Sequence, residues 1–365
     1  MRNTIWEPVR RAAALVALIL LAGCAGEPAS TAGGPSGTPS PAESAIGGWR
    51  VVAAPSGGAA LDDVACVSSG DCWAVGGAAD GLVGVIIEHE VHGTWTLLPS
   101  GQSGQLNGIT CLTSGVCWAV GQGPHGPLVE TYTTGGWRIV DAPNPGDDYW
   151  LNDVACPTSD DCWAVGGGAA ALIEHYSGGA WTEVGAPTLV TGTDGVVGLG
   201  GIACPGVDDC WAAAGTAFAH YSGSGWTLVA VPHGESPGES PGDVQSVACA
   251  SASQCWAVGF TSAPFRPLMD EYTGSTWTAV TGPAVAGNSD LEGVACLASG
   301  VCWAVGSSSG NLQSLIEVTG GQGWTVVTGS DQVGQLQSVA CVTASDCWAV
   351  GHSGGGGFIE TDAGG

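Results

Sequence analysis

The sequence predicts an all-β protein, a seven-bladed β-propeller, because one unit recurs along most of its 365 residues. A C-x5-C pair followed by Trp occurs seven times, and the first cysteines of successive pairs lie 45 to 48 residues apart. Each unit reads as four short strands, and a period of about 40 to 50 residues is typical of propeller blades. An open β-solenoid is the alternative, but the unit is long for one solenoid coil.

The repeat at residues 151–187 shows the four strands of a blade. "LNDVAC" and "CWAVG" predict the first two strands, and the turn formers "PTSDD" join them. "ALIEHY" predicts the third strand, and "WTEVGAP" predicts the fourth after the turn "SGGA". One Trp follows each second Cys and another opens each fourth strand, and we expect both to pack neighbouring blades together.

Fourteen of the fifteen cysteines form local pairs, and Cys24 stands alone. Exported chains enter an oxidising compartment, and no CxxC or Cys/His cluster of the zinc-finger kind occurs. Cysteines that face each other across a hairpin are close enough to bridge. We therefore predict one disulfide hairpin per blade, joining Cys66 to Cys72, Cys111 to Cys117, Cys156 to Cys162, Cys204 to Cys210, Cys249 to Cys255, Cys296 to Cys302 and Cys341 to Cys347.

The two ends of the repeat region are offset. "GGWRVVAAP" looks like a fourth strand with no unit before it, and the last unit ends in "FIETDAGG" with no Trp strand after it. We expect residues 48–54 to complete the last blade, so that the N-terminal strand closes the ring. Closure of this kind leaves no exposed sheet edge between the two ends.

The first 45 residues differ from the propeller region, which we place at 46–365. Residues 1–23 have a charged start and an apolar run too short to span a bilayer, which indicates a signal peptide. "LAGC" resembles the bacterial lipobox, and this resemblance implies cleavage before Cys24 and acylation of its thiol. Residues 24–45 then form a flexible Pro/Ser/Gly tether of roughly 25 Å. We expect an exported protein, lipid-anchored to the outer face of the cell membrane.

The charge of the chain restricts its partners. The formal net charge is −27, and the only Lys or Arg residues after residue 45 are Arg50, Arg138 and Arg266. Such a chain repels nucleic acid and anionic lipid headgroups, so neither is an expected partner. The acidity favours solubility as a monomer outside the cell, and it leaves cations and basic partners open.

The unit "LxxVAC-x5-CWAVG … LIEHYSGGxW" resembles a family of secreted repeat proteins common in high-GC Gram-positive bacteria. The resemblance spans residues 46–365 and implies a disulfide-stapled propeller. It implies nothing about a substrate. The turn before the fourth strand also occupies the position of the Asp-box turn of sialidase-type propellers. "YSGGAW" lacks the Asp of that turn, so the likeness is one of position only.

Residues that occur in most blades are expected to serve the blade rather than a reaction. For the acids of the third strand we favour a hydrogen-bonding role, with a Ca²⁺ site left open and no cofactor or metal site predicted. The His residues that follow them and the Asp residues before the second Cys are assigned to the blade and the turn. These residues are Glu88, Glu130, Glu174, Asp270, Glu317 and Glu360 with Ala219 in the remaining blade, then His89, His175 and His220, then Asp71, Asp161, Asp209 and Asp346.

Loops between blades supply the candidate binding face. "NPGDDYWLND" carries a Tyr–Trp pair that suits either a binding platform for a sugar ring or protein, or a cover folded over the blade. The remaining candidates come from loops between the second and third strands of other blades. The candidate face comprises Asp147, Asp148, Tyr149, Trp150, Phe265, Arg266, His125 and His352.

No catalytic residues are assigned. A sialidase arginine triad is missing, every cysteine of the propeller is paired, and no G-x-S-x-G, H-E-x-x-H or phosphate loop stands in a suitable context. The inner strands ("VAC", "IAC", "ITC") carry no charged side chains in these segments, so we expect a plain channel wall, which favours binding over catalysis. We expect a binding or scaffolding module for an envelope protein or glycan. The alternative is a hydrolase or lyase with its site in the central funnel.

Overall fold

The computed structural model describes residues 48–362, apart from 58, 79–83, 101, 190–196, 233–241, 263–264, 310–312, 321–322, 328, 331 and 355. The predicted signal peptide, Cys24, the predicted tether and most of the acidic insertion at 232–243 lie outside the described residues. Within the described part every regular element is a strand, and no helix there is long and apolar enough to cross a bilayer.

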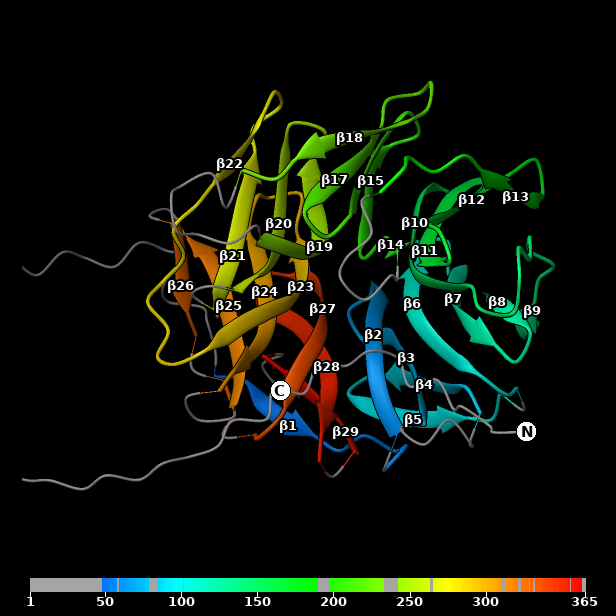
Figure 1. The fold of residues 1–365 in the computed structure, drawn as a ribbon. Helices are drawn as coiled ribbons and strands as arrows, with labels where there is room; N and C mark the ends of the chain where they lie inside the picture. Colours follow the sequence, from blue (N-terminus) through cyan, green and yellow to red (C-terminus); the bar gives the residue numbers. More distant parts are fainter. Residues whose placement is uncertain are drawn as a thin grey trace, which may run out of the picture. The chain divides into compact units, whose positions relative to one another are not determined.

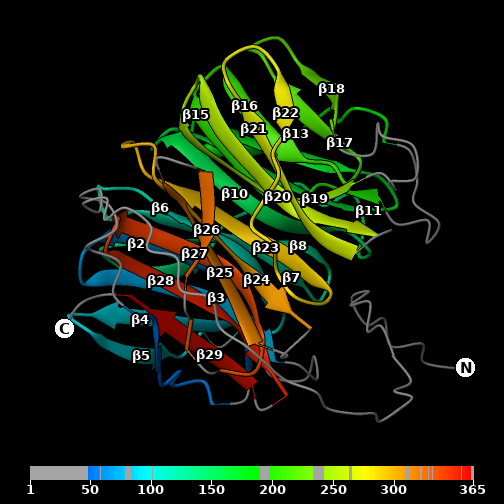
Figure 2. The same ribbon diagram turned by 90° about the vertical axis from the view of Figure 1, so that its left-hand side faces the viewer.

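The strands form seven antiparallel sheets around a central axis, the blades of a propeller (Figures 1 and 2). Blades 1 to 6 are each built from strands that follow one another along the chain, and β14 (Val197–Gly198) adds to blade 3 by pairing with β11. Their strands are, in blade 1, β2 (Ala59–Ser68), β3 (Asp71–Ala78), β4 (Ile86–Val91) and β5 (Thr94–Leu98); in blade 2, β6 (Gln105–Cys111), β7 (Cys117–Gly123), β8 (Gly126–Thr133) and β9 (Gly136–Ile139); in blade 3, β10 (Trp150–Thr158), β11 (Asp161–Gly168), β12 (Leu172–Ser177) and β13 (Ala180–Val184); in blade 4, β15 (Ile202–Gly206), β16 (Asp209–Ala213), β17 (Ala217–Tyr221) and β18 (Trp226–Ala230); in blade 5, β19 (Gly242–Ser251), β20 (Gln254–Ser262), β21 (Phe265–Tyr272) and β22 (Trp277–Ala279); in blade 6, β23 (Ser289–Cys296), β24 (Cys302–Ser308), β25 (Gln313–Gly320) and β26 (Gly323–Val326).

Blade 7 is completed by the N-terminal strand, as the offset repeat predicts. β27 (Gln335–Thr343), β28 (Asp346–Ser353) and β29 (Gly356–Thr361) are joined by β1 (Arg50–Val52), which pairs antiparallel with β29. Trp49 is buried just before β1 and meets Trp303 of blade 6 edge-on, with ring centroids 5.5 Å apart. Arg50 and Trp348 both pair with Thr361, so the chain enters blade 7 at the end of the sheet that carries the disulfide turn.

Seven disulfides staple the hairpins, one in each blade, which confirms the predicted pairing. Cys66 and Cys72, for example, stand directly opposite each other in the ladder between β2 and β3, with their Cα atoms 4.0 Å apart. The second Cys of each pair is fully buried. Each bridge therefore holds the register of the two inner strands of its blade.

A pair of Trp residues joins every two neighbouring blades. The Trp after the second Cys of one blade meets, edge-on, the Trp of the fourth strand in the next blade, at centroid distances of 5.1 to 5.5 Å. Such pairs stabilise by about 0.5–1.5 kcal/mol beyond their burial. The predicted packing role is confirmed for Trp73 with Trp137, Trp118 with Trp181, Trp163 with Trp226, Trp211 with Trp277, Trp256 with Trp324, Trp303 with Trp49, and Trp348 with Trp95.

Candidate functional site

The innermost strand of most blades contains a β-bulge at the two variable positions of "LxxVAC". The ladder shifts register between Leu61 and Asp63 in blade 1, and at the equivalent positions of blades 2, 3, 5, 6 and 7. A bulge re-aims consecutive side chains, so both variable residues reach the axis of the ring. They line the channel as Asp62 and Asp63, Asn107, Asn152 and Asp153, Gly200 and Gly201, Gln245 and Ser246, Glu292 and Gly293, Gln337 and Ser338.

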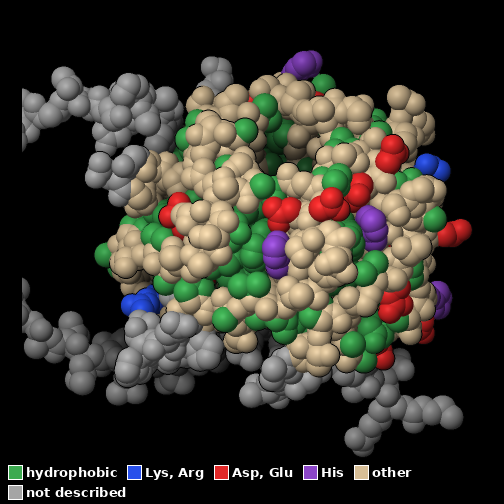
Figure 3. Space-filling model, turned by 90° about the horizontal axis from the view of Figure 1, so that it is seen from above, with side chains coloured by type: hydrophobic (Ala, Val, Ile, Leu, Met, Phe, Trp, Pro, Cys, Tyr) green, Lys and Arg blue, Asp and Glu red, His purple; other side chains and the backbone are tan. Residues whose placement is uncertain are grey.

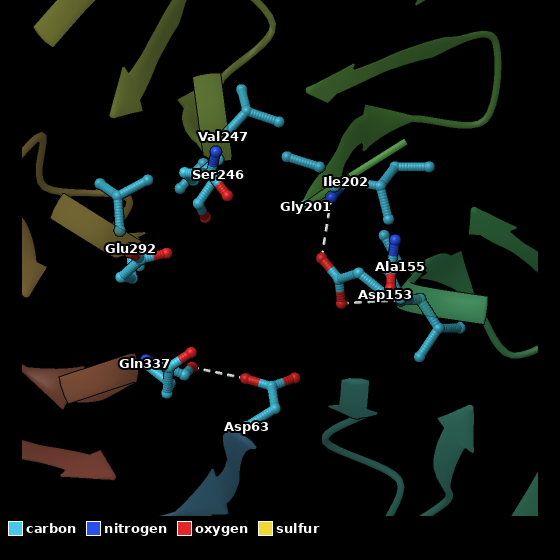
Figure 4. A pocket seen from close by; sticks show the side chains of 18 of the residues that line it. Asp63, Asp153, Ala155, Gly201, Ile202, Ser246, Val247, Glu292 and Gln337 are labelled. Carbon is cyan, nitrogen blue, oxygen red and sulfur yellow. Dashed lines mark hydrogen bonds between the residues drawn. The ribbon is translucent and has the colours of Figure 1, made fainter. Parts of the chain in front are cut away.

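The channel is a cavity of about 510 Å³ with an acidic wall. Asp62, Asp63, Asp153 and Glu292 contribute carboxyls from three different blades, and no Lys, Arg or His lies among the described residues that line it. Figure 4 shows Asp63, Asp153 and Glu292 directed from separate strands toward one shared space. The channel therefore suits a ligand that offers hydrogen-bond donors or positive charge.

Two of these carboxyls also hold neighbouring blades together. Asp63 accepts a hydrogen bond from the backbone N–H of Ile109 in blade 2 (2.6 Å) and another from the hydroxyl of Ser338 in blade 7. Asp153 accepts from the backbone N–H of Ile202 in blade 4 (2.8 Å). Asp63 thus bridges the first and last blades at the axis, whereas β1 pairs with β29 within blade 7 at its outer edge.

Glycines alternate with the larger residues around this inner ring. A Cβ on Gly108 would lie 2.6 Å from the Cα of Asp153, and one on Gly293 would lie 2.9 Å from the Cα of Ser338. Both contacts are with backbone, which cannot move aside without shifting a blade. The absence of a side chain at these positions lets the neighbouring blade bring its own side chain to the axis.

Burial raises the pKa of three channel carboxyls, those of Asp63, Asp153 and Glu292, and repulsion from other carboxyls adds to each rise. Burial raises the pKa of Asp63 to about 6, with a further rise from Asp62 and an opposing effect from Ser338. Burial, and then the charge of Asp63, raise the pKa of Asp153 well above its ordinary value. Burial, followed by the charges of Asp290 and Asp243, raises the pKa of Glu292 to about 8. A bound cation would lower these pKa values and displace protons.

The expectation of a plain inner wall is wrong. The "VAC" segments are plain, but the two residues before each of them carry the carboxyls and amides of the channel. The signal in the sequence was the variation of these two positions from blade to blade within an otherwise repeated strand.

The structure brings His125 next to Asn144, in the connection that leads to the Asp147–Trp150 segment. The side-chain amide of Asn144 donates to the carbonyl of His125, so the blade 2 hairpin touches the connection to blade 3. Asp147 and Asp148 are exposed, and the ring of Tyr149 packs on Gly168 and against the core between blades 2 and 3. Trp150 is half-buried at the start of β10, opposite Gly167. Tyr149 thus folds over the blade, while Trp150 stays open to solvent on part of its surface.

The other candidates lie at the same end of the sheets but in other blades. Phe265 begins β21 and stacks on Phe260, with centroids 5.1 Å apart, beside the exposed Arg266. His352 lies in β28 of blade 7, opposite Gln335. The candidate face is therefore spread around the rim of the ring instead of gathered in one patch. Its role in binding stays a prediction.

The six acids of the third strand sit one per blade interface, each buried with at most 2 % of its surface exposed. Glu88 accepts from the backbone N–H of Ser56 (2.7 Å), and Glu360 accepts from the hydroxyl of Ser314 (2.8 Å), as a hydrogen-bonding role requires. Within the described part of the chain, both carboxyl oxygens of Glu174 and of Glu317 lack a hydrogen-bond partner. Among the described residues, no group of three or more His, Cys, Asp or Glu is placed to hold a metal ion.

The repeated His and Asp residues pair with each other in blades 1, 3 and 4. His89, His175 and His220 each stack on the Trp of their own blade at 3.7 to 3.9 Å, nearly parallel. Their Nε2 atoms lie 2.8 to 3.1 Å from the carboxylates of Asp71, Asp161 and Asp209. These His–Asp pairs lie beside the disulfide hairpin of their blade, and none of their residues lines the channel.

Comparison with known proteins supports the fold alone. No protein-family model matches the chain, and no curated protein matches it. Solved structures do: YCF48 bound to D1 peptide (TM-score 0.59, 12 % identity, 86 % of this chain and 96 % of that one) and the WD40 propeller domain of Doa1 (TM-score 0.60, 12 % identity, 86 % and 97 %). The GH74 xyloglucanase from Xanthomonas campestris is also similar (TM-score 0.60, 14 % identity), over 85 % of this chain and 53 % of that chain.

Proposed function

We propose that the protein is a lipid-anchored binding module on the outer face of the cell membrane. Its propeller binds an envelope protein or glycan at the channel end that carries the candidate face. The observation that carries this proposal is the channel of about 510 Å³, whose wall is made by the residues that differ between otherwise repeated blades. Residues that escape a repeat are free to serve a ligand, while repeated ones serve packing.

The chemistry of the wall indicates what the partner offers. Carboxyls and amides line the channel and no basic side chain does so among the described lining residues, which favours ammonium, guanidinium or hydroxyl groups on the partner. Acidic side chains are scattered over the face shown in Figure 3, where basic ones are sparse. A propeller of the same fold has been solved with a peptide bound, which supports a polypeptide as the partner.

The point of entry of the chain supports this arrangement. β1 begins at the disulfide-turn end of blade 7, level with Trp348, whereas Trp150 and Phe265 begin strands at the opposite end. Trp150 and Phe265 thus lie at the end of the sheets opposite to the first residue of β1.

Binding of the full chain to envelope extracts and to a glycan array tests this function. We expect capture of a partner to be weakened by Gln337→Arg, which places a cation in the channel, and by Trp150→Ala at the rim. Ser159→Arg, an equal change of charge on an exposed disulfide turn, is the matched control. Equal capture by all variants would refute the proposed site.

The alternative of a hydrolase or lyase rests on Glu292. This side chain lines the channel, and one of its carboxyl oxygens accepts a hydrogen bond from the side-chain amide of Gln335 (2.9 Å). Burial and the charges of Asp290 and Asp243 raise the pKa of Glu292, and a carboxyl with a raised pKa is what a general acid requires. Polysaccharide cleavage that is lost in Glu292→Gln and retained in Ser159→Arg would favour this alternative over binding.

A further inference from the structure

The interfaces between blades contain carboxyls that have no partner, which is unusual for a protein interior. Glu130, Glu174 and Glu317 occupy the same position of the third strand in blades 2, 3 and 6. Each is at most 2 % exposed. Among the described residues, neither oxygen of Glu174 or Glu317 finds a hydrogen-bond partner, and neither does Oε1 of Glu130.

These side chains lie between two blades. Alternation along β12 puts Glu174 on the face of Leu172 and Tyr176, which pack against Trp118 and Val120 of blade 2. On β25, Glu317 shares its face with Leu315, which packs against blade 5, and on β8, Glu130 shares its face with Leu128, which packs against blade 1. On the outermost strand of each blade, the residues paired with Glu130, Glu174 and Glu317 are, in that order, Ile139, Glu183 and Val326.

In two other blades the same carboxyl has at least one hydrogen-bond partner, although Oε2 of Glu88 has none among the described residues. Glu88 and Glu360 accept backbone N–H groups from Ser56 and Ser330, in the connections that lead out of the preceding blade. Blade 4 carries the fully buried Ala219 instead of an acid, so the fold does not require a carboxyl at this position.

We propose that the interfaces of blades 1/2, 2/3 and 5/6 form a pH-sensitive latch. They stay closed while Glu130, Glu174 and Glu317 are protonated, and they loosen when the surrounding pH rises and the carboxyls ionise without a partner. Ionisation in an apolar interface is costly because nothing there replaces the lost hydration. The latch is independent of what the channel binds.

The titration behaviour agrees with this geometry. Burial raises the pKa of Glu130 to about 7 and the pKa of Glu317 to about 8, and no charged neighbour acts on either. Burial raises the pKa of Glu174 to about 8, with a smaller rise from Glu183 across on β13. Between the ordinary carboxyl range and these values the folded chain holds protons that the unfolded chain releases. Stability therefore falls as pH rises through this window.

Urea unfolding of the full chain from about pH 5 to about pH 9 tests the latch. Each acid contributes up to about tenfold per pH unit in the unfolding equilibrium constant, so the wild type should weaken steeply. The double variant Glu174→Gln/Glu317→Gln keeps the shape of both side chains and should make the profile less steep than that of the wild type. Glu271→Gln, on the opposite face of the third strand in blade 5, is the matched control and should leave the slope unchanged.

Two further measurements distinguish a latch from a merely structural role. Ala219→Glu should steepen the pH profile, because it adds a carboxyl to the one interface that lacks it. Infrared spectra should show protonated carboxyls in the wild type at neutral pH, with a weaker band in the double variant. Parallel pH profiles in the wild type and the double variant, with equal infrared bands, would overturn the proposal.

Discussion

Replacement of Trp49 by Ala tests the closure of the ring by the N-terminal strand. Trp49 is 4 % exposed and packs edge-on against Trp303 of blade 6, in a cluster with Ile316 and Val339. Loss of a buried Trp side chain costs roughly 3–5 kcal/mol. The free energy of unfolding of a whole domain is about 5–15 kcal/mol, so this loss is a large part of it.

The location of the damage distinguishes closure from ordinary core packing. Trp226→Ala is the matched control, because Trp226 occupies the same repeat position in blade 4 and meets Trp163 at the same 5.5 Å. Both variants should be destabilised to a similar extent in urea unfolding followed by fluorescence. Hydrogen exchange of β29 should accelerate only in Trp49→Ala, since its partner β1 is no longer held.

Equal protection of the β29 amides in both variants would show that β1 does not close blade 7. Deletion of residues 46–55 extends the test, since it removes the whole strand and should expose the edge of β29 to solvent and to aggregation.

The inner ring and the disulfides give two further predictions. Gly108→Ala should destabilise by about 1–3 kcal/mol in urea unfolding, because its Cβ meets the backbone of Asp153, whereas Gly185→Ala has open space and should be close to neutral; equal effects of the two substitutions would contradict the close approach. Replacement of Cys156 and Cys162 together by Ser should cost about 2 kcal/mol on the chain-entropy model, and an unchanged unfolding midpoint would show that the bridge does not constrain the unfolded chain.

The repeat made the architecture predictable. One period with four strands, one Cys pair and two Trp residues per unit specifies blade number, disulfides and blade packing together. The offset of "GGWRVVAAP" then specifies the closure, because a missing strand at one end matches a spare strand at the other. The confirmed pairing of β1 with β29 follows from counting strands alone.

The channel wall was not predictable in the same way. Strict alternation along a strand assigns Asp62 and Asp63 to opposite faces, but the bulge between Leu61 and Asp63 turns both toward the axis. For Tyr149 and Trp150, the sequence left open whether the side chain covers the blade or faces solvent. Both are aromatic loop residues in sequence, and only packing against Gly168 reveals that Tyr149 covers the blade.

Site-specific cross-linking tests the central claim, that the propeller binds a partner at its channel, from the end of the sheets where Trp150 and Phe265 lie. A photo-reactive side chain at Gln337 in the channel, or at Ser159 on an exposed disulfide turn, is introduced into the full chain in intact cells. We predict a defined cross-linked product from position 337 and none from position 159. Adducts from position 159 alone, or from neither position, would contradict a binding site at the channel.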